Sequence, residues 1–226
     1  MATILELAQL SAAAYGGPVP NGWTKIGQSQ TSHGYFGVAF HNAAGDIVIA
    51  NRGTDIWNFS NFTNLLNLGS DIQLALGHAT LVQDDAATFA LSIAKNPLYS
   101  GKPIIETGHS LGGNEAQAAV VALVKSSGLP PSSITGVTFN SPGIGGYAHG
   151  STTNYNVTNF FDQGDAIHLA GGSHLGTSIL RRGSKLRYTF LNSRIHSRGD
   201  SARLCNGKTA IFEPRPLFVP HSVTQL

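Results

Sequence analysis

Several residue types that mark particular protein classes are scarce in this sequence. Cys205 is the only cysteine, which excludes an intrachain disulfide framework and a cysteine-based zinc site. Charged residues make up only 12 % and the formal net charge is +2, which is too weak to indicate nucleic-acid binding. No apolar run is long enough to cross a membrane. What is left is a globular chain of 226 residues, long enough to bury a sizeable core.

The N-terminus also lacks the basic stretch of a Sec-type signal and has an acidic residue, Glu6, early in the chain. Export would therefore need a route without such a signal, or a leader removed from this sequence.

Hydrophobic periodicity predicts strands that alternate with helices. Helices are expected at residues 4–15 and 79–95, and the segment around Trp23 is expected to be a loop. The predicted strands are Gly34–His41, Asp46–Asn51, Gly136–Phe139, Asn156–Phe161 and Lys185–Phe190. The first two form an antiparallel hairpin. This order favours one α/β domain over residues 1–226, parallel in the middle of the sheet and antiparallel at its N-terminal edge.

The chain is organised around residues 103–113, Pro-Ile-Ile-Glu-Thr-Gly-His-Ser-Leu-Gly-Gly. A β-like apolar run leads into Gly108–Gly112, and an alanine-rich stretch with helical spacing follows. This context gives the G-x-S-x-G pattern its meaning as a nucleophile elbow, a strained turn that presents Ser110. The two flanking glycines would let strand and helix approach closely. The alternative is an ordinary glycine turn in which Ser110 only caps the helix.

A serine nucleophile needs a histidine to accept its proton and an acid to orient that histidine. In folds with such an elbow, the acid follows a later strand and the histidine comes last. Asp165 follows the strand predicted at Asn156–Phe161, and Gly164 would let the turn point it inward. Asp162, at the end of the same strand, is the competing candidate, and either aspartate could also be a plain turn residue.

Four histidines follow these acids: His168, His174, His196 and His221. The first two come so soon that a tight loop would have to fold them back, and His196 lies between arginines. His221 precedes an apolar-patterned tail that could dock on the sheet, so it is the preferred base, with His196 next. His109 lies inside the elbow and is a poor base for the neighbouring serine.

Acyl transfer also needs hydrogen-bond donors for the developing oxyanion. The backbone N–H of Leu111, directly after the serine, is one donor by position. The second is expected from Arg52-Gly53-Thr54, where Gly53 permits a tight turn and Thr54 offers its N–H and hydroxyl. The alternative is a plain strand-ending turn with Arg52 in a surface ion pair.

The segment Ile56–Leu76 interleaves large apolar residues with asparagine and serine rather than with charge. It is either core packing or a mobile apolar flap beside the site, as an interfacial enzyme would need.

Together these stretches resemble the class 3 lipase family of α/β-hydrolases, and within it bacterial lipases and phospholipase A1-like proteins. Gly108–Gly113 is similar to the family's elbow almost letter for letter, and Asn51–Thr54 to its Phe-Arg-Gly-Thr/Ser loop. Three further segments resemble the stretch after that loop, the Phe-Gly-Ser-Pro strand end and the Asp-x-Val acid loop: Ser70–Ala75, Phe139–Gly143 and Gly164–Ile167. Asn51 departs from the usual phenylalanine, and no arginine follows Pro142.

The resemblance implies an α/β-hydrolase fold with a mostly parallel central sheet, an antiparallel N-terminal hairpin and helices on both faces. It implies Ser110 as nucleophile, Asp165 as acid and His221 as base, with Thr54 and Leu111 forming the oxyanion hole and no metal or organic cofactor. The implied substrate is a triacylglycerol or glycerophospholipid at a membrane or lipid-droplet surface. The implied setting is export from a bacterium by a signal-independent route. A soluble short-chain carboxylesterase or thioesterase, and a non-catalytic lipid-binding domain, are the alternatives.

Overall fold

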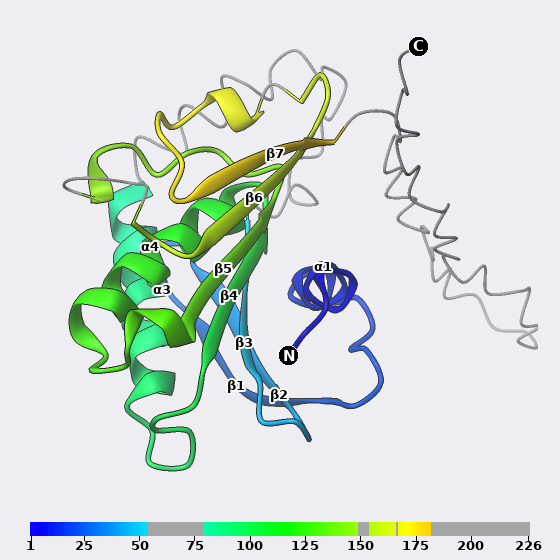
Figure 1. Ribbon diagram of the computed structural model, residues 1–226, viewed down its shortest axis with the longest axis vertical. Coiled ribbons are helices and arrows are strands. Elements are labelled where there is room, and N and C mark those ends of the chain that lie inside the picture. Colours follow the sequence, from blue (N-terminus) through cyan, green and yellow to red (C-terminus); the bar gives the residue numbers. More distant parts are fainter. Residues whose placement is uncertain (54–78, 149–153, 166, 182–226) are drawn as a thin grey trace, which may run out of the picture. The chain divides into compact units, whose positions relative to one another are not determined.

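The computed structural model describes residues 1–53, 79–148, 154–165 and 167–181, all within one compact unit (Figure 1). The predicted flap at Ile56–Leu76 and the predicted strand at Lys185–Phe190 lie outside the described residues. So do Thr54, His196 and His221. The single domain predicted for residues 1–226 therefore stays a prediction.

Within the described residues, seven strands form one sheet in the order β1 to β7. β1, β2 and β3 are antiparallel neighbours, and every pair from β3 to β7 is parallel. The strands are β1 (Trp23–Gln30), β2 (Phe36–Asn42), β3 (Ile47–Arg52), β4 (Ile104–His109), β5 (Ile134–Phe139), β6 (Val157–Asp162) and β7 (Thr177–Arg181). The predicted α/β class, the hairpin and the antiparallel N-terminal edge are confirmed.

Helices cover both faces of this sheet, as Figure 1 shows. α1 (Ile4–Ala13) packs on one face against β3, β4 and β5. α3 (Ala79–Ala94) and α4 (Leu111–Ser126) pack together on the other. Short 3₁₀ turns are η2 (Pro131–Ser133), η3 (Gly145–Ala148) and η4 (Ile167–Leu169).

The sequence-based prediction is wrong at both edges of the sheet. The segment around Trp23, predicted to be a loop, forms β1, and β7 was not among the predicted strands. β1 is half exposed and carries an irregularity between Lys25 and Gly27, while β7 is exposed along most of its length. An edge strand that buries little of its surface lacks the strong apolar pattern by which strands are recognised.

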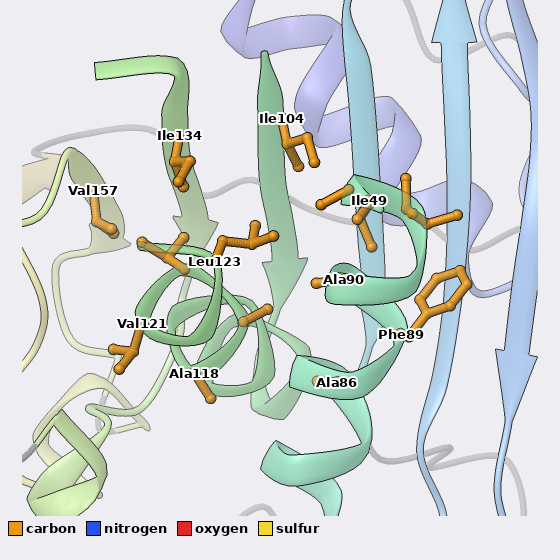
Figure 2. Packing of buried hydrophobic residues seen from close by; sticks show 14 of the residues in the cluster. Ile49, Ala86, Phe89, Ala90, Ile104, Ala118, Val121, Leu123, Ile134 and Val157 are labelled. Carbon is orange, nitrogen blue, oxygen red and sulfur yellow. The ribbon is translucent and has the colours of Figure 1, made fainter. Parts of the chain in front are cut away.

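The main core lies between the sheet and the helix pair α3–α4 (Figure 2). Ile49, Ile104 and Ile134, from three neighbouring strands, are fully buried there. They face Ala90 of α3 and Leu123 of α4, which are also fully buried. Each large aliphatic side chain buried in this way contributes about 1.5–3 kcal/mol, and this core holds β4 and α4 on either side of the elbow.

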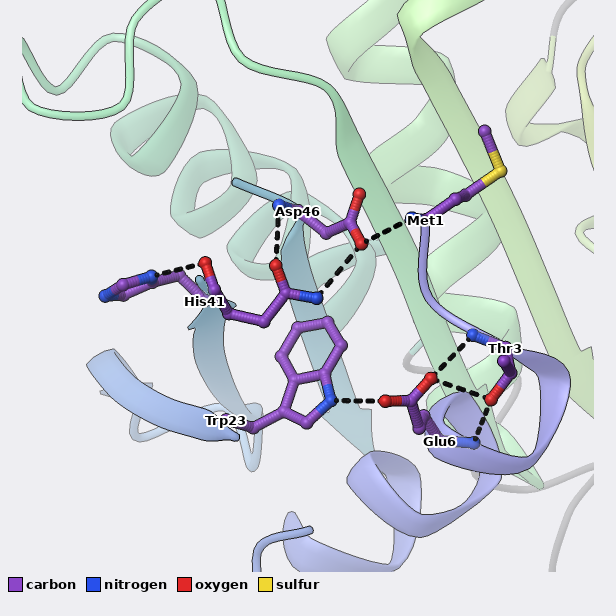
Figure 3. Close-up of polar contacts among 7 residues, drawn as sticks. Met1, Thr3, Glu6, Trp23, His41 and Asp46 are labelled. Carbon is purple, nitrogen blue, oxygen red and sulfur yellow. Dashed lines mark hydrogen bonds and ion pairs between the residues drawn. The ribbon is translucent and has the colours of Figure 1, made fainter. Parts of the chain in front are cut away.

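The start of α1 is tied to the antiparallel edge by a set of polar contacts (Figure 3). Thr3 and Glu6 form a capping box, with the Glu6 N–H donating to Thr3 Oγ1 (3.2 Å) and the Thr3 N–H donating to Glu6 Oε2 (2.8 Å). The indole Nε1–H of Trp23 donates to Glu6 Oε1 at 3.0 Å. Trp23 therefore anchors the first turn of α1 to β1.

None of the helices in the described ranges combines the length and the apolar character that a membrane span requires.

Candidate active site

Ser110 lies between the end of β4 and the start of α4, with φ 56° and ψ −133°. Few residues with a Cβ adopt this backbone conformation, and holding one there costs about 1–3 kcal/mol. The Ser110 N–H donates to the carbonyl oxygen of Phe139 on the neighbouring strand (3.1 Å), which helps to hold the turn. Ser110 occupies the N-cap position of α4, but its side chain accepts no hydrogen bond from the helix. The capping alternative therefore does not describe this serine.

The glycines around Ser110 are required by close backbone contacts. A Cβ added to Gly108 would lie 2.1 Å from the carbonyl oxygen of Gly112. A Cβ added to Gly112 would lie 2.2 Å from the carbonyl oxygen of Asn51 in β3. The predicted close approach of strand and helix is thus present, and the turn is held by contacts that leave no room for a side chain.

The segment predicted to supply the second oxyanion donor follows β3 directly. Gly53 is buried against the elbow, where an added Cβ would lie 2.8 Å from the backbone nitrogen of Gly112. Leu111 is the first residue of α4, so its N–H is one of the helix's unpaired N-terminal groups. The structure therefore brings Gly53 against the start of α4, while Thr54 lies outside the described residues.

The two candidate acids share one turn after β6. Asp162 ends the strand, and the N–H of Asp165 donates to the Asp162 carbonyl oxygen (3.1 Å) across Gly164, whose φ is 88°. Oδ1 of Asp165 accepts from the Ile167 N–H at 2.9 Å, while Oδ2 is buried without a partner among the described residues. Asp162 Oδ2 lies 3.5 Å from Nδ2 of Asn140, and its Oδ1 is likewise buried and unpartnered within the described ranges. Each aspartate thus keeps one free acceptor.

Burial raises the pKa of Asp165, while the hydrogen bond from Ile167 and the nearby His168 lower it. β4 and β6 are parallel and separated by β5 alone. Ser110 and this acid turn therefore both follow the carboxyl ends of their strands, on the same side of the sheet.

Two of the later histidines hold the acid loop. The His168 ring stacks on Phe161 with centroids 4.2 Å apart, and its Nδ1 contacts the Asp165 carbonyl oxygen. Nε2 of His174 lies 2.9 Å from the His168 carbonyl oxygen. Because a carbonyl oxygen only accepts, His168 Nδ1 and His174 Nε2 act as donors, and each histidine is hydrogen-bonded to the backbone.

His109 is the elbow histidine at the end of β4. Burial lowers its pKa to about 4, against the charge of Asp162, which raises it. The ring is therefore neutral at pH 7, and it contacts Tyr15 edge-on. It packs within the elbow, as expected for this position.

Comparisons with known proteins agree with this geometry. The family model described as lipase (class 3) matches residues 48–170, more than half of the chain. The chain belongs to the class 3 lipase family. A search of curated protein sequences found no significant match.

Two solved structures have a similar fold. A lipase from Rhizopus microsporus var. chinensis gives a TM-score of 0.55 at 18 % identity, covering 81 % of this chain and 77 % of that one. A fungal lipase in complex with an inhibitor gives 0.52 at 18 % identity, covering 77 % of each chain. The α/β-hydrolase fold is thereby confirmed. As a class 3 lipase, the chain is a carboxylic ester hydrolase that acts on lipid esters.

This class 3 lipase buries a polar network beneath the loop that follows β5. Nδ2 of Asn114 donates to the Gly143 carbonyl oxygen (2.6 Å), and Nε2 of Gln117 donates to the Pro142 carbonyl oxygen (3.1 Å). Oε1 of Gln117 accepts from the Leu175 N–H at 2.9 Å. Two amides of α4 therefore hold loops beside the site. In the sequence these amides stand in Asn-Glu-Ala-Gln inside an alanine-rich helix, a local pattern that does not reveal which loops they contact.

A second buried network in the lipase lies under the elbow, on the α3–α4 side. Tyr35 Oη donates to Oδ1 of Asn51 (2.8 Å), and Nδ2 of Asn51 donates to Oε2 of Glu106 (2.8 Å). Burial raises the pKa of Glu106 to about 8, against the hydrogen bond from Asn51, which lowers it. Asn51, noted as a departure from the family's phenylalanine, thus pairs with a buried acid that sequence reasoning missed.

Within the described part of the chain, no three His, Cys, Asp or Glu side chains are grouped so as to hold a metal ion.

Proposed function

We propose that this class 3 lipase is a serine hydrolase that cleaves triacylglycerols or glycerophospholipids through an acyl-enzyme intermediate. Ser110 is the nucleophile, Asp165 the acid and His221 the base. The backbone N–H groups of Leu111 and Thr54 form the oxyanion hole.

In the first half-reaction, Ser110 Oγ attacks the ester carbonyl carbon while its proton passes to the His221 imidazole. The carbonyl oxygen becomes an oxyanion that accepts hydrogen bonds from Leu111 and Thr54. The tetrahedral intermediate expels the alcohol, which takes the proton from His221. In the second half-reaction, water gives a proton to His221 and attacks the acyl carbon. Ser110 then leaves with that proton, and the fatty acid is released.

The conformation of Ser110 is the observation that carries this proposal. A serine held at φ 56° by contacts that admit only glycine on both sides is the arrangement that presents a hydroxyl at the top of a sheet. The Leu111 N–H follows at the start of α4, which supports its role as an oxyanion donor.

The acid is supported by the unpartnered oxygen of Asp165. With Oδ1 held by the Ile167 N–H, the buried Oδ2 is free to accept the N–H of an imidazole. His221 rests on chain order and on the family resemblance.

We also propose action at a lipid surface, with Ile56–Leu76 as a mobile apolar flap beside the site. The fungal lipase–inhibitor complex was described as a model for interfacial activation in lipases. The corresponding expectation for this chain is a sharp rise in rate above the solubility limit of the substrate. Export from a bacterium by a signal-independent route stays a prediction.

The test compares hydrolysis of a long-chain triacylglycerol emulsion and of phosphatidylcholine vesicles by the wild type, Ser110→Ala and Ser133→Ala. Ser133 is a partly exposed serine of η2 whose hydroxyl donates to the nearby Pro130 carbonyl oxygen (2.8 Å), so Ser133→Ala controls for losing a hydroxyl. The rate of hydrolysis is expected to fall by at least about 10³-fold in Ser110→Ala and to stay unchanged in Ser133→Ala. The preferred lipid then identifies a lipase or a phospholipase A1.

Activity that survives in Ser110→Ala would overturn the serine mechanism. A rate that does not rise above the solubility limit would favour a soluble short-chain esterase. Lipid binding without turnover by the wild type would favour a binding domain.

A further inference from the structure

The side chain of Tyr15, which follows α1, connects the two halves of the candidate site. Its hydroxyl donates to the carbonyl oxygen of His109 at 3.1 Å and accepts the N–H of Gly53 at 2.8 Å. Its ring meets the His109 ring edge-on, with centroids 6.4 Å apart. One phenol oxygen therefore lies between the end of β4 and the segment that follows β3.

Tyr15, the elbow and Gly53 are packed so closely that no side chain fits at Gly53. A Cβ on Gly53 would lie 2.9 Å from Tyr15 Oη, 2.9 Å from the His109 carbonyl oxygen and 2.8 Å from the Gly112 nitrogen. Contacts shorter than 3.0 Å require something to move. Only glycine therefore allows Tyr15, the elbow and the Gly53 segment to share this point.

Both proposed oxyanion donors are close in sequence to the groups that Tyr15 holds. Thr54 directly follows Gly53, and Leu111 comes two residues after His109. An oxyanion hole is effective only when its donors lie about 2.7–3.1 Å from the developing charge. A displacement of about 1 Å lowers a rate by about 10²-fold. The separation of the two backbone segments therefore matters directly to the reaction.

We propose that Tyr15 is a positioning residue: its hydroxyl holds the backbone of Gly53 and of His109, which neighbour the two proposed oxyanion donors in sequence, at a fixed separation. This inference rests on the proposed function and adds to it a residue from the N-terminal helix region. In this role Tyr15 acts through the backbone of Gly53 and His109.

The test variant is Tyr15→Phe, which removes only the hydroxyl. The matched control is Trp23→Phe, which removes the 3.0 Å hydrogen bond between Trp23 and Glu6 (Figure 3). Both bonds tie the α1 region to the sheet. However, Trp23 pairs with Asn42 beside the turn that joins β2 and β3. Tyr15 instead reaches the carboxyl ends of β3 and β4, at the other end of these strands.

We expect Tyr15→Phe to lower kcat on a soluble p-nitrophenyl ester by about 10–50-fold, less than the 10²–10³-fold loss of a whole donor. KM should change by less than about twofold, because only transition-state stabilisation is weakened. Trp23→Phe should keep the wild-type kcat, even if its melting temperature falls as much as that of Tyr15→Phe. Reactive sites are counted by phosphorylation with diethyl p-nitrophenyl phosphate, so partial unfolding lowers the count and not kcat per site.

A wild-type kcat per reactive site in Tyr15→Phe would overturn the proposal. So would a raised KM with unchanged kcat, or an equal fall in kcat in both variants, which would reflect a loosened α1. If Ser110→Ala retains activity, the hydrolase mechanism itself fails. If Ser110→Ala is inactive and Tyr15→Phe is fully active, only the positioning role fails.

Discussion

The turn after β4 and the turn after β6 both carry candidate catalytic residues, but they are held in different ways. At the elbow, Gly108 and Gly112 lie so close to neighbouring backbone that an added Cβ would come within 2.1–2.2 Å of a carbonyl oxygen. At the acid turn, no contact within 4 Å of an added Cβ is found for Gly164 among the described residues. The first turn is held by steric exclusion, and the second by a few hydrogen bonds.

This difference shows which position the fold defines more strictly. Steric exclusion leaves Ser110 one backbone conformation and one place in the sheet. Hydrogen bonds hold the acid turn but leave two half-buried aspartates in the same short loop, each with one buried oxygen that has no partner among the described residues. The structure thus specifies the backbone position of Ser110, the proposed nucleophile, strictly, whereas it leaves two candidate acids in one loop.

The largest effect is expected where the two aspartates are compared directly. Asp165→Asn should lower kcat by about 10³–10⁴-fold, because an amide cannot hold the imidazole in the required tautomer. Asp162→Asn should keep most of the activity, since Oδ2 of Asp162 already lies near Nδ2 of Asn140. Steady-state kinetics on a soluble ester measures both. The opposite order of the two losses would transfer the acid role to Asp162.

A smaller effect, on folding, separates steric from hydrogen-bonded control. Gly112→Ala should destabilise the protein by more than about 3 kcal/mol, because the Asn51 carbonyl oxygen would have to move. Gly164→Ala should cost only about 1–2 kcal/mol, the price of φ 88° with a Cβ in open space. Urea unfolding measures both free energies. Equal losses would show that the two turns are held alike.

The last effect, on the pH dependence of stability, concerns Glu106, the buried acid of β4. Its pKa of about 8 in the folded state lies above the ordinary 4.5, so unfolding releases a proton between these pH values. Wild-type stability therefore falls as the pH rises from 4.5 to 8. Glu106→Gln should be more stable than wild type by about 2–4 kcal/mol at pH 8, with the gain vanishing near pH 4.

Glu6→Gln serves as the control with the opposite sign. Hydrogen bonds from Thr3 and Trp23 lower the pKa of Glu6, so its carboxylate stabilises the fold above its ordinary pKa. Glu6→Gln should therefore be less stable than wild type at neutral pH, and the difference should shrink in acid. Denaturant melts from pH 4 to pH 9 follow both variants. A Glu106→Gln gain that is constant with pH would show that Glu106 is not protonated by burial.

Sequence reasoning succeeded where the evidence is local. The glycines and apolar runs around Ser110 predicted the strand, the turn and the helix, because each is encoded within a few neighbouring residues. It failed for β1, whose half-exposed surface gives little pattern. It also missed the burial of Glu106, because a single acid in a β-like run does not reveal which face of the sheet is covered.

The family, the order of the candidate residues and the backbone geometry that glycine allows at the elbow follow from the sequence, because these depend on short stretches of chain. Which distant groups meet follows from the packing of the folded chain. The sequence predicts Tyr15 at the end of a helix, yet its hydroxyl forms hydrogen bonds with the backbone of Gly53 and His109. Folding brings these groups together because α1 packs across β3 and β4, and no local pattern encodes that contact.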